Sequence, residues 1–242
     1  ISGNTAGFGG GIWFNHAGGE SPSLVNVMIS DNHADNSGGG VYCDNSDPSF
    51  ENVTISGNSA TGTSHPKGGG IYCLHSDPSF ENVTISGNHA DWDGGGVYCS
   101  HVSSPSFENV TISGNSTSGK GAGVYCDHSD LSFENVTISG NVASTGGGGV
   151  ALENSESSFE NVTISDNVAN TGAGGVHCIS MSFPIFENVT ITGNSSTLEE
   201  IGGLYSGSSN PILLNSILWG NSPEEYGNVW GTFTATYSDI RG

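Results

Sequence analysis

Basic side chains are almost absent from this sequence. Lysine and arginine together number 3, against 24 aspartates and glutamates, and the formal net charge is −21. Nucleic acids and anionic lipids are held mainly by basic side chains, so this acidic composition excludes both as expected partners. The sequence also has no apolar run close to the roughly 18 residues that predict a membrane-spanning helix, so we expect no membrane span.

Paired cysteines and helical patterns are missing as well. Five cysteines are an odd number, which fits neither a complete disulfide framework nor a paired-cysteine zinc site. No long amphipathic pattern appears among the 39 glycines and the many short polar residues, which argues against helices. No signal peptide is visible, and the chain starts within a repeat, so we expect further residues upstream of Ile1.

One nine-residue string recurs along most of the chain. FENVTISGN stands at residues 50–58, 80–88, 107–115 and 133–141, and with one change each at 159–167 and 186–194. Its final asparagine recurs at steps of 26 to 30 residues from Asn4 to Asn221. Near-constant spacing predicts a solenoid, because each repeat buries its apolar face only against its neighbours. We expect a single domain over residues 1–242 with about eight to nine coils, and a terminal coil and cap at 215–242.

Each repeat contains three short apolar segments, such as 68–73, 78–81 and 83–86, which are flanked by turn residues and therefore predict strands. In the third segment, alternation points Val83 and Ile85 inward. Three short strands per coil of 26–30 residues predict an all-β fold, a right-handed parallel β-helix whose coils stack about 4.8 Å apart.

Two corners follow from the phase of the inward residues. Phe80 and Val83 both face inward although they are three residues apart, so the chain must turn at Asn82. The same mismatch after Ile85 predicts a second corner at Asn88 and the glycine before it. Stacked asparagines can satisfy the polar groups of tight bends, so we expect two asparagine ladders. One comprises Asn26, Asn52, Asn82, Asn109, Asn135, Asn161, Asn188 and Asn215, and the other comprises Asn4, Asn32, Asn58, Asn88, Asn115, Asn141, Asn167, Asn194 and Asn221.

The cysteines occupy one inward column. Phe14 and Leu152 stand at equivalent positions in other repeats, so the column favours a buried apolar side chain, and buried thiols are unreactive. We therefore expect free thiols at Cys43, Cys73, Cys99, Cys126 and Cys178.

Paired outward hydroxyls form the most regular surface pattern. Two columns about 7 Å apart across the strand and about 4.8 Å apart along the rod make a flat polar grid. Such a grid is typical of ice-binding β-solenoids, although β-branched threonine also simply suits an exposed strand. The candidate surface comprises Thr54, Ser56, Thr84, Ser86, Thr111, Ser113, Thr137, Ser139, Thr163, Ser165, Thr190 and Thr192.

A second outward column is acidic. Like charges on adjacent strands repel, so these carboxylates either fan into water or hold Ca²⁺ between coils. No calcium-binding loop motif occurs in the sequence, which favours the solvated alternative, and we expect no other metal or cofactor. The candidate calcium column comprises Glu51, Glu81, Glu108, Glu134, Glu160 and Glu187.

A third column is aromatic. Exposed stacked rings could bind the faces of sugars, but they also stabilise a sheet by packing on one another. The candidate glycan-stacking column comprises Tyr42, Tyr72, Tyr98 and Tyr125.

The pairing of FENV with GGGVYC resembles the FxxN and GGAI repeats of chlamydial polymorphic membrane proteins. It more closely resembles secreted bacterial right-handed β-helix repeat proteins, in which strings such as NVTISGN and GGGI recur. Residues 215–242 look like the terminal coils of choice-of-anchor surface proteins, although the sorting tail is lacking. The resemblance implies a bacterial protein that is secreted or held at the cell surface, and it implies no particular ligand, because one fold carries many activities.

A polysaccharide-active enzyme is the alternative from another class. An elimination mechanism needs basic groups, and the only arginine is Arg241. A hydrolytic mechanism needs paired carboxylates, for which Asp91 and Asp93 beside Trp92 are the nearest match. We therefore expect no enzyme. We expect a structural module for adhesion, spacing or fibre assembly, with a glycan or protein surface as ligand and end-to-end stacking as a means of self-association. Ice binding is the first alternative.

Overall fold

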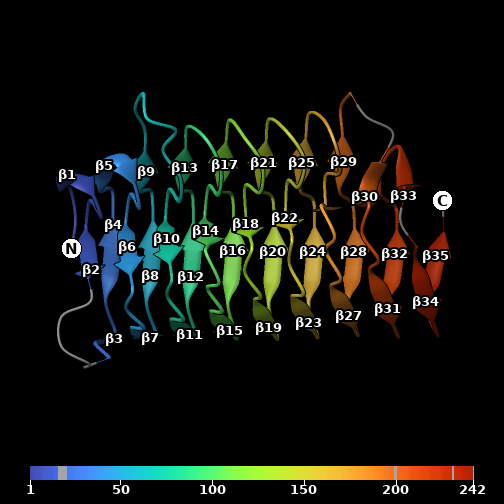
Figure 1. Ribbon diagram of the computed structural model, residues 1–242, viewed down its shortest axis with the longest axis horizontal. Helices are drawn as coiled ribbons and strands as arrows, with labels where there is room; N and C mark the ends of the chain where they lie inside the picture. The colour runs from blue at the N-terminus through green and yellow to red at the C-terminus, as the bar shows by residue number, and fades with distance from the viewer. Residues whose placement is uncertain (16–20, 199–200, 231, 242) are drawn as a thin grey trace.

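The described residues form a parallel β-helix. The computed structural model describes residues 1–15, 21–198, 201–230 and 232–241. These residues contain no α-helix, and hence none that could cross a membrane. Successive coils lie side by side along one axis, from β1 near the N-terminus to β35 near the C-terminus (Figure 1). The predicted all-β parallel solenoid is confirmed, with about eight turns.

Four parallel sheets run along the rod instead of the three that the sequence predicted. We name three of them after the column that they carry. The tyrosine sheet comprises β2 (Ile12–Asn15), β6 (Val41–Asp44), β10 (Ile71–Leu74), β14 (Val97–Ser100), β18 (Val124–Asp127), β22 (Val150–Glu153), β26 (Val176–Ile179), β30 (Ile201–Gly207) and β33 (Glu224–Val229). The glutamate sheet comprises β3 (Ser23–Val25), β7 (Ser49–Glu51), β11 (Ser79–Glu81), β15 (Ser106–Glu108), β19 (Ser132–Glu134), β23 (Ser158–Glu160), β27 (Ile185–Glu187), β31 (Ile212–Leu214) and β34 (Thr234–Thr236). The threonine sheet comprises β4 (Met28–Ser30), β8 (Thr54–Ser56), β12 (Thr84–Ser86), β16 (Thr111–Ser113), β20 (Thr137–Ser139), β24 (Thr163–Ser165), β28 (Thr190–Thr192), β32 (Ile217–Trp219) and β35 (Asp239–Arg241).

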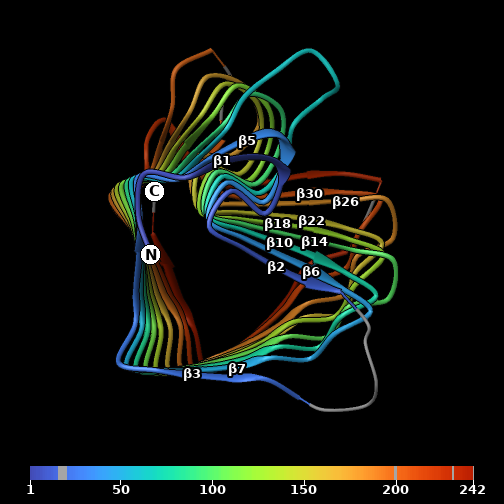
Figure 2. The same ribbon diagram turned by 90° about the vertical axis from the view of Figure 1, so that its left-hand side faces the viewer.

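The fourth sheet is short and was missed. It comprises β1 (Thr5–Phe8), β5 (His33–Ser37), β9 (Ser59–Ala60), β13 (His89–Ala90), β17 (Ser116–Thr117), β21 (Val142–Ala143), β25 (Val168–Ala169) and β29 (Ser195–Ser196). Figure 2 shows β3 and β7 along the lower edge of the end view, β2 and β6 on the right, and β1 and β5 above them. The sequence feature that could have predicted this sheet is a small inward residue two positions after the asparagines of the Asn4 to Asn221 series. Ala60 and Ala90 are examples, and both are fully buried.

The core consists of columns of like residues. The rings of Phe50, Phe80, Phe107, Phe133, Phe159 and Phe186 stack with centroids 4.7 to 4.9 Å apart. Val83 and Ile85 are 1% and 0% exposed, as alternation predicted. In-register pairing therefore places equivalent residues of successive coils directly above one another, which positions every surface column described below.

Only one of the two predicted asparagine ladders forms. Asn88 is fully buried, donates through its Nδ2 to the Oδ1 of Asn115 at 3.0 Å, and accepts from the amide of Asn58 at 2.9 Å. The same pattern runs from Asn4 to Asn221, and the buried carboxylate of Glu225 accepts from the backbone N–H and the Nδ2 of Asn221 at the end of the ladder.

The prediction of a second ladder from Asn26 to Asn215 is wrong. These residues hold the first corner in the left-handed region, as Asn82 does with φ of 54°, a conformation that asparagine tolerates better than most residues. Their side chains are exposed. The corner is held from coil to coil by backbone bonds, such as the one from the amide of Asn82 to the carbonyl of Glu108 at 3.0 Å.

Candidate functional site

The predicted hydroxyl grid lies on the outer face of the threonine sheet. Parallel pairing sets threonine beside threonine and serine beside serine from β8 to β24, and the pattern continues to Thr190 and Thr192 in β28. The inward residue between each pair, such as Ile112, is fully buried, so all twelve hydroxyl-bearing side chains share the outer face. The grid ends at Met28 on one side and at Ile217 and Trp219 on the other, which are 60%, 44% and 49% exposed. The structure therefore brings the candidate ice-binding residues together as one ordered array.

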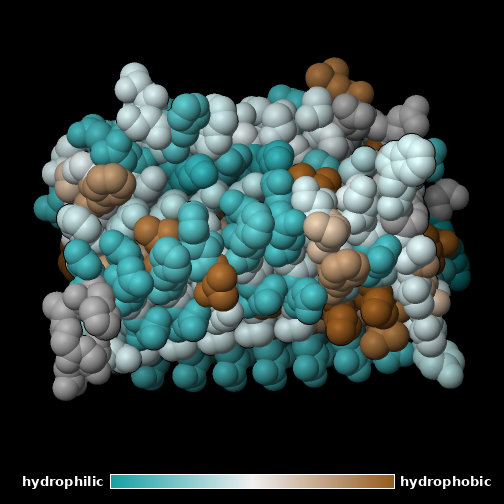
Figure 3. Space-filling model, viewed as in Figure 1, coloured by the Kyte–Doolittle hydropathy of each residue, from teal (hydrophilic) through white to brown (hydrophobic). Residues whose placement is uncertain are grey.

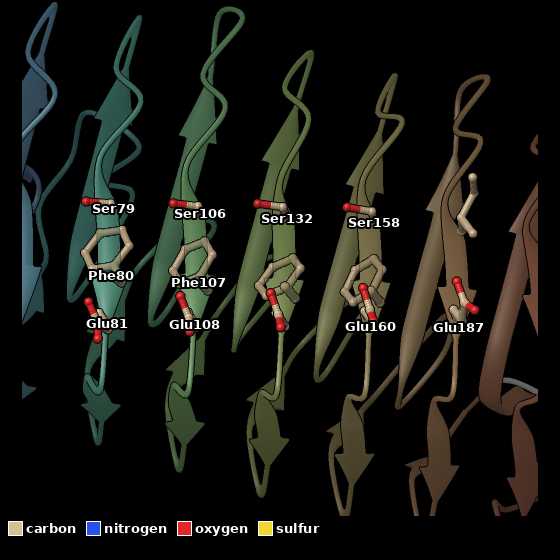
Figure 4. Close-up of a pocket in the computed structure, with 14 residues that line it drawn as sticks. Ser79, Phe80, Glu81, Ser106, Phe107, Glu108, Ser132, Ser158, Glu160 and Glu187 are labelled. Atoms are coloured by element: carbon tan, nitrogen blue, oxygen red, sulfur yellow. The ribbon is translucent and has the colours of Figure 1, made fainter.

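The acidic column lies on the glutamate sheet. Figure 4 shows Ser79, Ser106 and Ser158 in one row and Glu81 and Glu108 in a parallel row beside it. The two rows border a shallow groove of about 310 Å³ that runs over five coils, from β11 to β27. Between the two rows the lining includes Phe80, Phe107, Phe133 and Phe159, which are only 1 to 2% exposed.

The carboxylates of this column do not converge. All six glutamates, from Glu51 to Glu187, are exposed. Among the residues that the structure describes, no three His, Cys, Asp or Glu side chains lie close enough together to hold one metal ion. Calcium between coils stays a prediction, and the geometry favours the solvated alternative.

The tyrosine column is buried, and the expectation that its rings are exposed is wrong. Tyr98 is 2% exposed, Tyr125 5% and Tyr42 8%, while Tyr72 is partly buried. The four rings stack on one another with centroids 4.9 to 5.1 Å apart. The backbone also packs closely against these rings. A Cβ added at Gly94 would overlap the Cβ of Tyr98. This geometry supports structural packing, since little ring face is left for a sugar to stack on.

Two of the three basic side chains lie on this aromatic column, a feature that sequence reasoning missed. Lys67 donates through its Nζ to the hydroxyl of Tyr98 at 2.9 Å and lies 4.5 Å from the centre of the ring. Lys120 pairs with Glu153 at 3.4 Å, and the hydroxyl of Tyr125 donates to the same carboxylate at 2.7 Å. Each lysine directly precedes the glycine-rich turn of its repeat. This shared position in the sequence could have predicted that both lysines lie on the same column.

These contacts shift the ionisation of Glu153 and Tyr125. Burial raises the pKa of Glu153, but the hydrogen bond from Tyr125 and the charge of Lys120 outweigh it and lower the pKa overall. Burial and the adjacent Glu153 raise the pKa of Tyr125 above its usual range. The carboxylate of Glu153 is therefore held in its charged form beside Lys120, and the hydroxyl of Tyr125 keeps its proton.

His177 interrupts the tyrosine column. Its ring packs edge-on against Tyr205 at 4.9 Å and leans over Gly146, where no Cβ could fit beside it. Its Nδ1 is buried without a hydrogen-bond partner. Burial, with a smaller contribution from Lys120, lowers the pKa of His177 to about 4. The imidazole is therefore neutral at neutral pH.

We expect His177 to destabilise the fold in acid. The unfolded chain takes up a proton near pH 6.5, whereas the folded chain resists protonation until about pH 4, so stability falls as the pH drops between these values. The gap corresponds to at most about 3 kcal/mol. Urea unfolding at about pH 7 and pH 4.5 should show a smaller loss in His177→Phe than in the wild type. Equal losses in both proteins would contradict the assigned environment.

The carboxylates proposed for hydrolysis are engaged in holding loops. Asp91 pairs with His89 at 3.2 Å and accepts from the amide of Gly62 at 3.1 Å. Asp93 accepts from the amide of Lys120 at 2.8 Å, and burial raises its pKa. Trp92 between them is 46% exposed. Both carboxylates thus make structural contacts, and this geometry gives no support to a hydrolytic pair.

Comparison with known proteins identifies the repeat. A family model described as a right-handed beta helix region matches residues 10–188 and 122–238, which together cover most of the chain. No curated protein and no solved structure matches the chain significantly. The match agrees with the parallel coils and the right-handed winding that the sequence predicted, and it names no ligand or reaction.

Proposed function

Because the chain belongs to the right-handed β-helix family, whose fold serves many functions, we propose that it works through its shape. It is a non-enzymatic structural module of a bacterial protein that is secreted or displayed at the cell surface. It serves adhesion, spacing or fibre assembly, with a glycan or protein surface as partner. No metal or cofactor is needed for this role.

The unbroken register of the coils carries this proposal. From β7 to β27 each strand of the glutamate sheet pairs residue for residue with the next, and the threonine sheet does the same from β8 to β28. A catalytic site would single out one coil, whereas a spacer needs every coil to be equivalent. Most of the surface in Figure 3 is hydrophilic. The net charge of −21 favours repulsion between molecules in solution, which supports a spacer more than a self-associating fibre.

Removing one complete repeat tests this role. Deletion of residues 89–115 joins Asn88 to Ser116, which occupies the position of His89 in the next coil. We expect the variant to fold cooperatively and to be shorter by about 5 Å, the spacing of one strand, in small-angle scattering. The full chain should release no products from neutral or acidic polysaccharides. Turnover of a polysaccharide, together with its loss on deletion of this one repeat, would instead indicate an enzyme.

Ice binding is the second candidate, and the regular hydroxyl grid of the threonine sheet favours it. If this surface binds ice, the full chain should inhibit ice recrystallisation and show thermal hysteresis. Thr111→Tyr and Thr137→Tyr place bulky rings at the centre of the grid, where both threonines are exposed, and should remove most of that activity without lowering the melting temperature. Glu108→Gln on the glutamate sheet is the matched control and should leave the activity unchanged. A wild type without activity excludes this candidate.

A further inference from the structure

Four of the five cysteines form a continuous row inside the rod. Parallel pairing places Cys43 beside Cys73, Cys73 beside Cys99, and Cys99 beside Cys126. All four are free and 0% exposed. Leu152 occupies the next coil and separates this thiol row from Cys178. The chain therefore contains both a row of thiols and an isolated thiol in the same inward column.

The thiols of the row have few other partners. Among the described residues, Cys126 is the member of the row whose thiol bonds outside it: its Sγ donates to the carbonyl of Ser129 at 2.7 Å and lies 3.3 Å from the hydroxyl of Ser155. The row is therefore a column of buried sulfurs with polar contacts at one end.

The spacing of the coils suits a bridging metal ion better than a disulfide. Equivalent atoms repeat about every 4.8 Å between in-register strands, and the adjacent phenylalanine stack repeats at 4.7 to 4.9 Å in this core. A disulfide requires Cβ atoms about 3.8 Å apart, so it would pull the coils together. Two bonds in line, each about as long as the 2.3 Å of a zinc–thiolate bond, span about 4.6 Å. Soft thiolate ligands select Cu(I), zinc and iron–sulfur clusters. Structural zinc takes four ligands around one ion, and the described residues offer no group of even three, so Cu(I) is the ion that fits pairs of thiolates.

We propose that Cys43, Cys73, Cys99 and Cys126 form a Cu(I) site, in which one two-coordinate ion lies between Cys43 and Cys73 and a second lies between Cys99 and Cys126. Each sulfur then binds a single ion, and the thiol of Cys126 exchanges its hydrogen bond to the carbonyl of Ser129 for the metal. One thiol of each pair releases its proton to solvent and the other keeps its own, so two positive and two negative charges cancel. Copper stays Cu(I) throughout. A neutral complex avoids the large cost of burying net charge in an apolar core.

The site needs only pairs of ligands. This agrees with the finding that, within the described part of the chain, no three candidate ligands surround a common point. Cys178 has Leu152 and Ser206 as its neighbours in the column, so it has no second sulfur within reach. The number of bound ions should therefore follow the number of separate pairs of neighbouring cysteines rather than the number of cysteines.

Counting bound copper in single-cysteine variants tests this rule. The reduced full chain is refolded without oxygen in the presence of Cu(I) supplied as its acetonitrile complex, and loosely held copper is removed with a competing chelator. Mass spectrometry should find about two ions in the wild type and about two in Cys178→Ala, which keeps the row of four sulfurs. It should find about one ion in Cys43→Ala and about one in Cys73→Ala, because each of these changes leaves a single pair of neighbouring sulfurs. X-ray absorption should show two sulfur neighbours per copper.

The same series distinguishes other outcomes. Circular dichroism confirms that each variant is folded, and the column already accepts Leu152 in place of cysteine. Equal losses of copper in Cys178→Ala and Cys73→Ala would overturn the proposal, since binding would then depend on the number of thiols alone. Retention of copper by a variant without any cysteine would overturn it in favour of histidine ligands. Folded wild type that retains no copper would also overturn it.

Discussion

Asn115→Ala is expected to lower the free energy of unfolding by about 3 to 5 kcal/mol. The side chain of Asn115 is fully buried, and its Oδ1 accepts from both the backbone amide and the Nδ2 of Asn88 at 3.0 Å. Its Nδ2 donates to Asn141 at 3.0 Å and to the carbonyl of Ile85 at 3.1 Å. Alanine leaves two buried N–H bonds of Asn88 without an acceptor, one on the backbone and one on the Nδ2, although the Nδ2 keeps its second bond to the carbonyl of Ile55. Each unsatisfied group costs about 1 to 3 kcal/mol.

Urea unfolding followed by circular dichroism measures this loss, and Asn109→Gly is the matched control. Asn109 lies in the same coil at the exposed corner, with φ of 54°. Glycine keeps that conformation and also keeps the amide that donates to Glu134 at 3.0 Å, so we expect a change of less than about 1 kcal/mol. Equal losses of unfolding free energy in Asn115→Ala and Asn109→Gly would contradict the prediction, because the buried hydrogen bonds of the ladder would then add no stability beyond that of the exposed corner.

Much of the fold was predictable because each coil stacks on the next, so the same residue type recurs at equivalent positions along the chain. The phase of Phe80, Val83 and Ile85 located the first corner, and the structure places the left-handed residue Asn82 there. The same letter pattern could not show which asparagine faces inward. Asparagine is favoured both where its side chain bridges coils and where its backbone adopts a left-handed conformation. Both causes produce an asparagine at the same position of every repeat, so the sequence alone does not distinguish them. The two-residue strands were missed because they are too short for alternation to appear.

The surfaces were less predictable than the core. Alternation placed the hydroxyl grid correctly on one face, since that face has nothing packed over it. It also pointed Tyr98 outward, but the preceding turn and Lys67 cover the ring, so an outward position was not an exposed one. The pairing of Lys120 with Glu153 joins residues 33 apart in sequence, and only the register of the coils shows that they meet.

Gly69→Ala is expected to cost more than about 4 kcal/mol, a loss that only a few mechanisms produce. A Cβ on Gly69 would lie 2.5 Å from the carbonyl oxygen of Gly95 and closer still to the carbonyl of His89, both in the next coil. These are backbone atoms, which cannot rotate away as a side chain can. The coils would have to separate, which would strain the bond from the amide of Gly69 to the carbonyl of Gly94 at 3.0 Å.

Gly87→Ala separates this steric cause from backbone conformation. Gly87 has φ of 62°, and the only atom near a Cβ there is the amide nitrogen of Gly57 at 3.9 Å. Alanine in the left-handed region costs about 1 to 2 kcal/mol, so Gly87→Ala should unfold at a higher urea concentration than Gly69→Ala. Comparable losses would mean that glycine recurs in these repeats mainly for its backbone freedom. The larger loss at Gly69 would mean that close contact between coils, which lets each turn stack on the next, is what requires glycine before the tyrosine sheet.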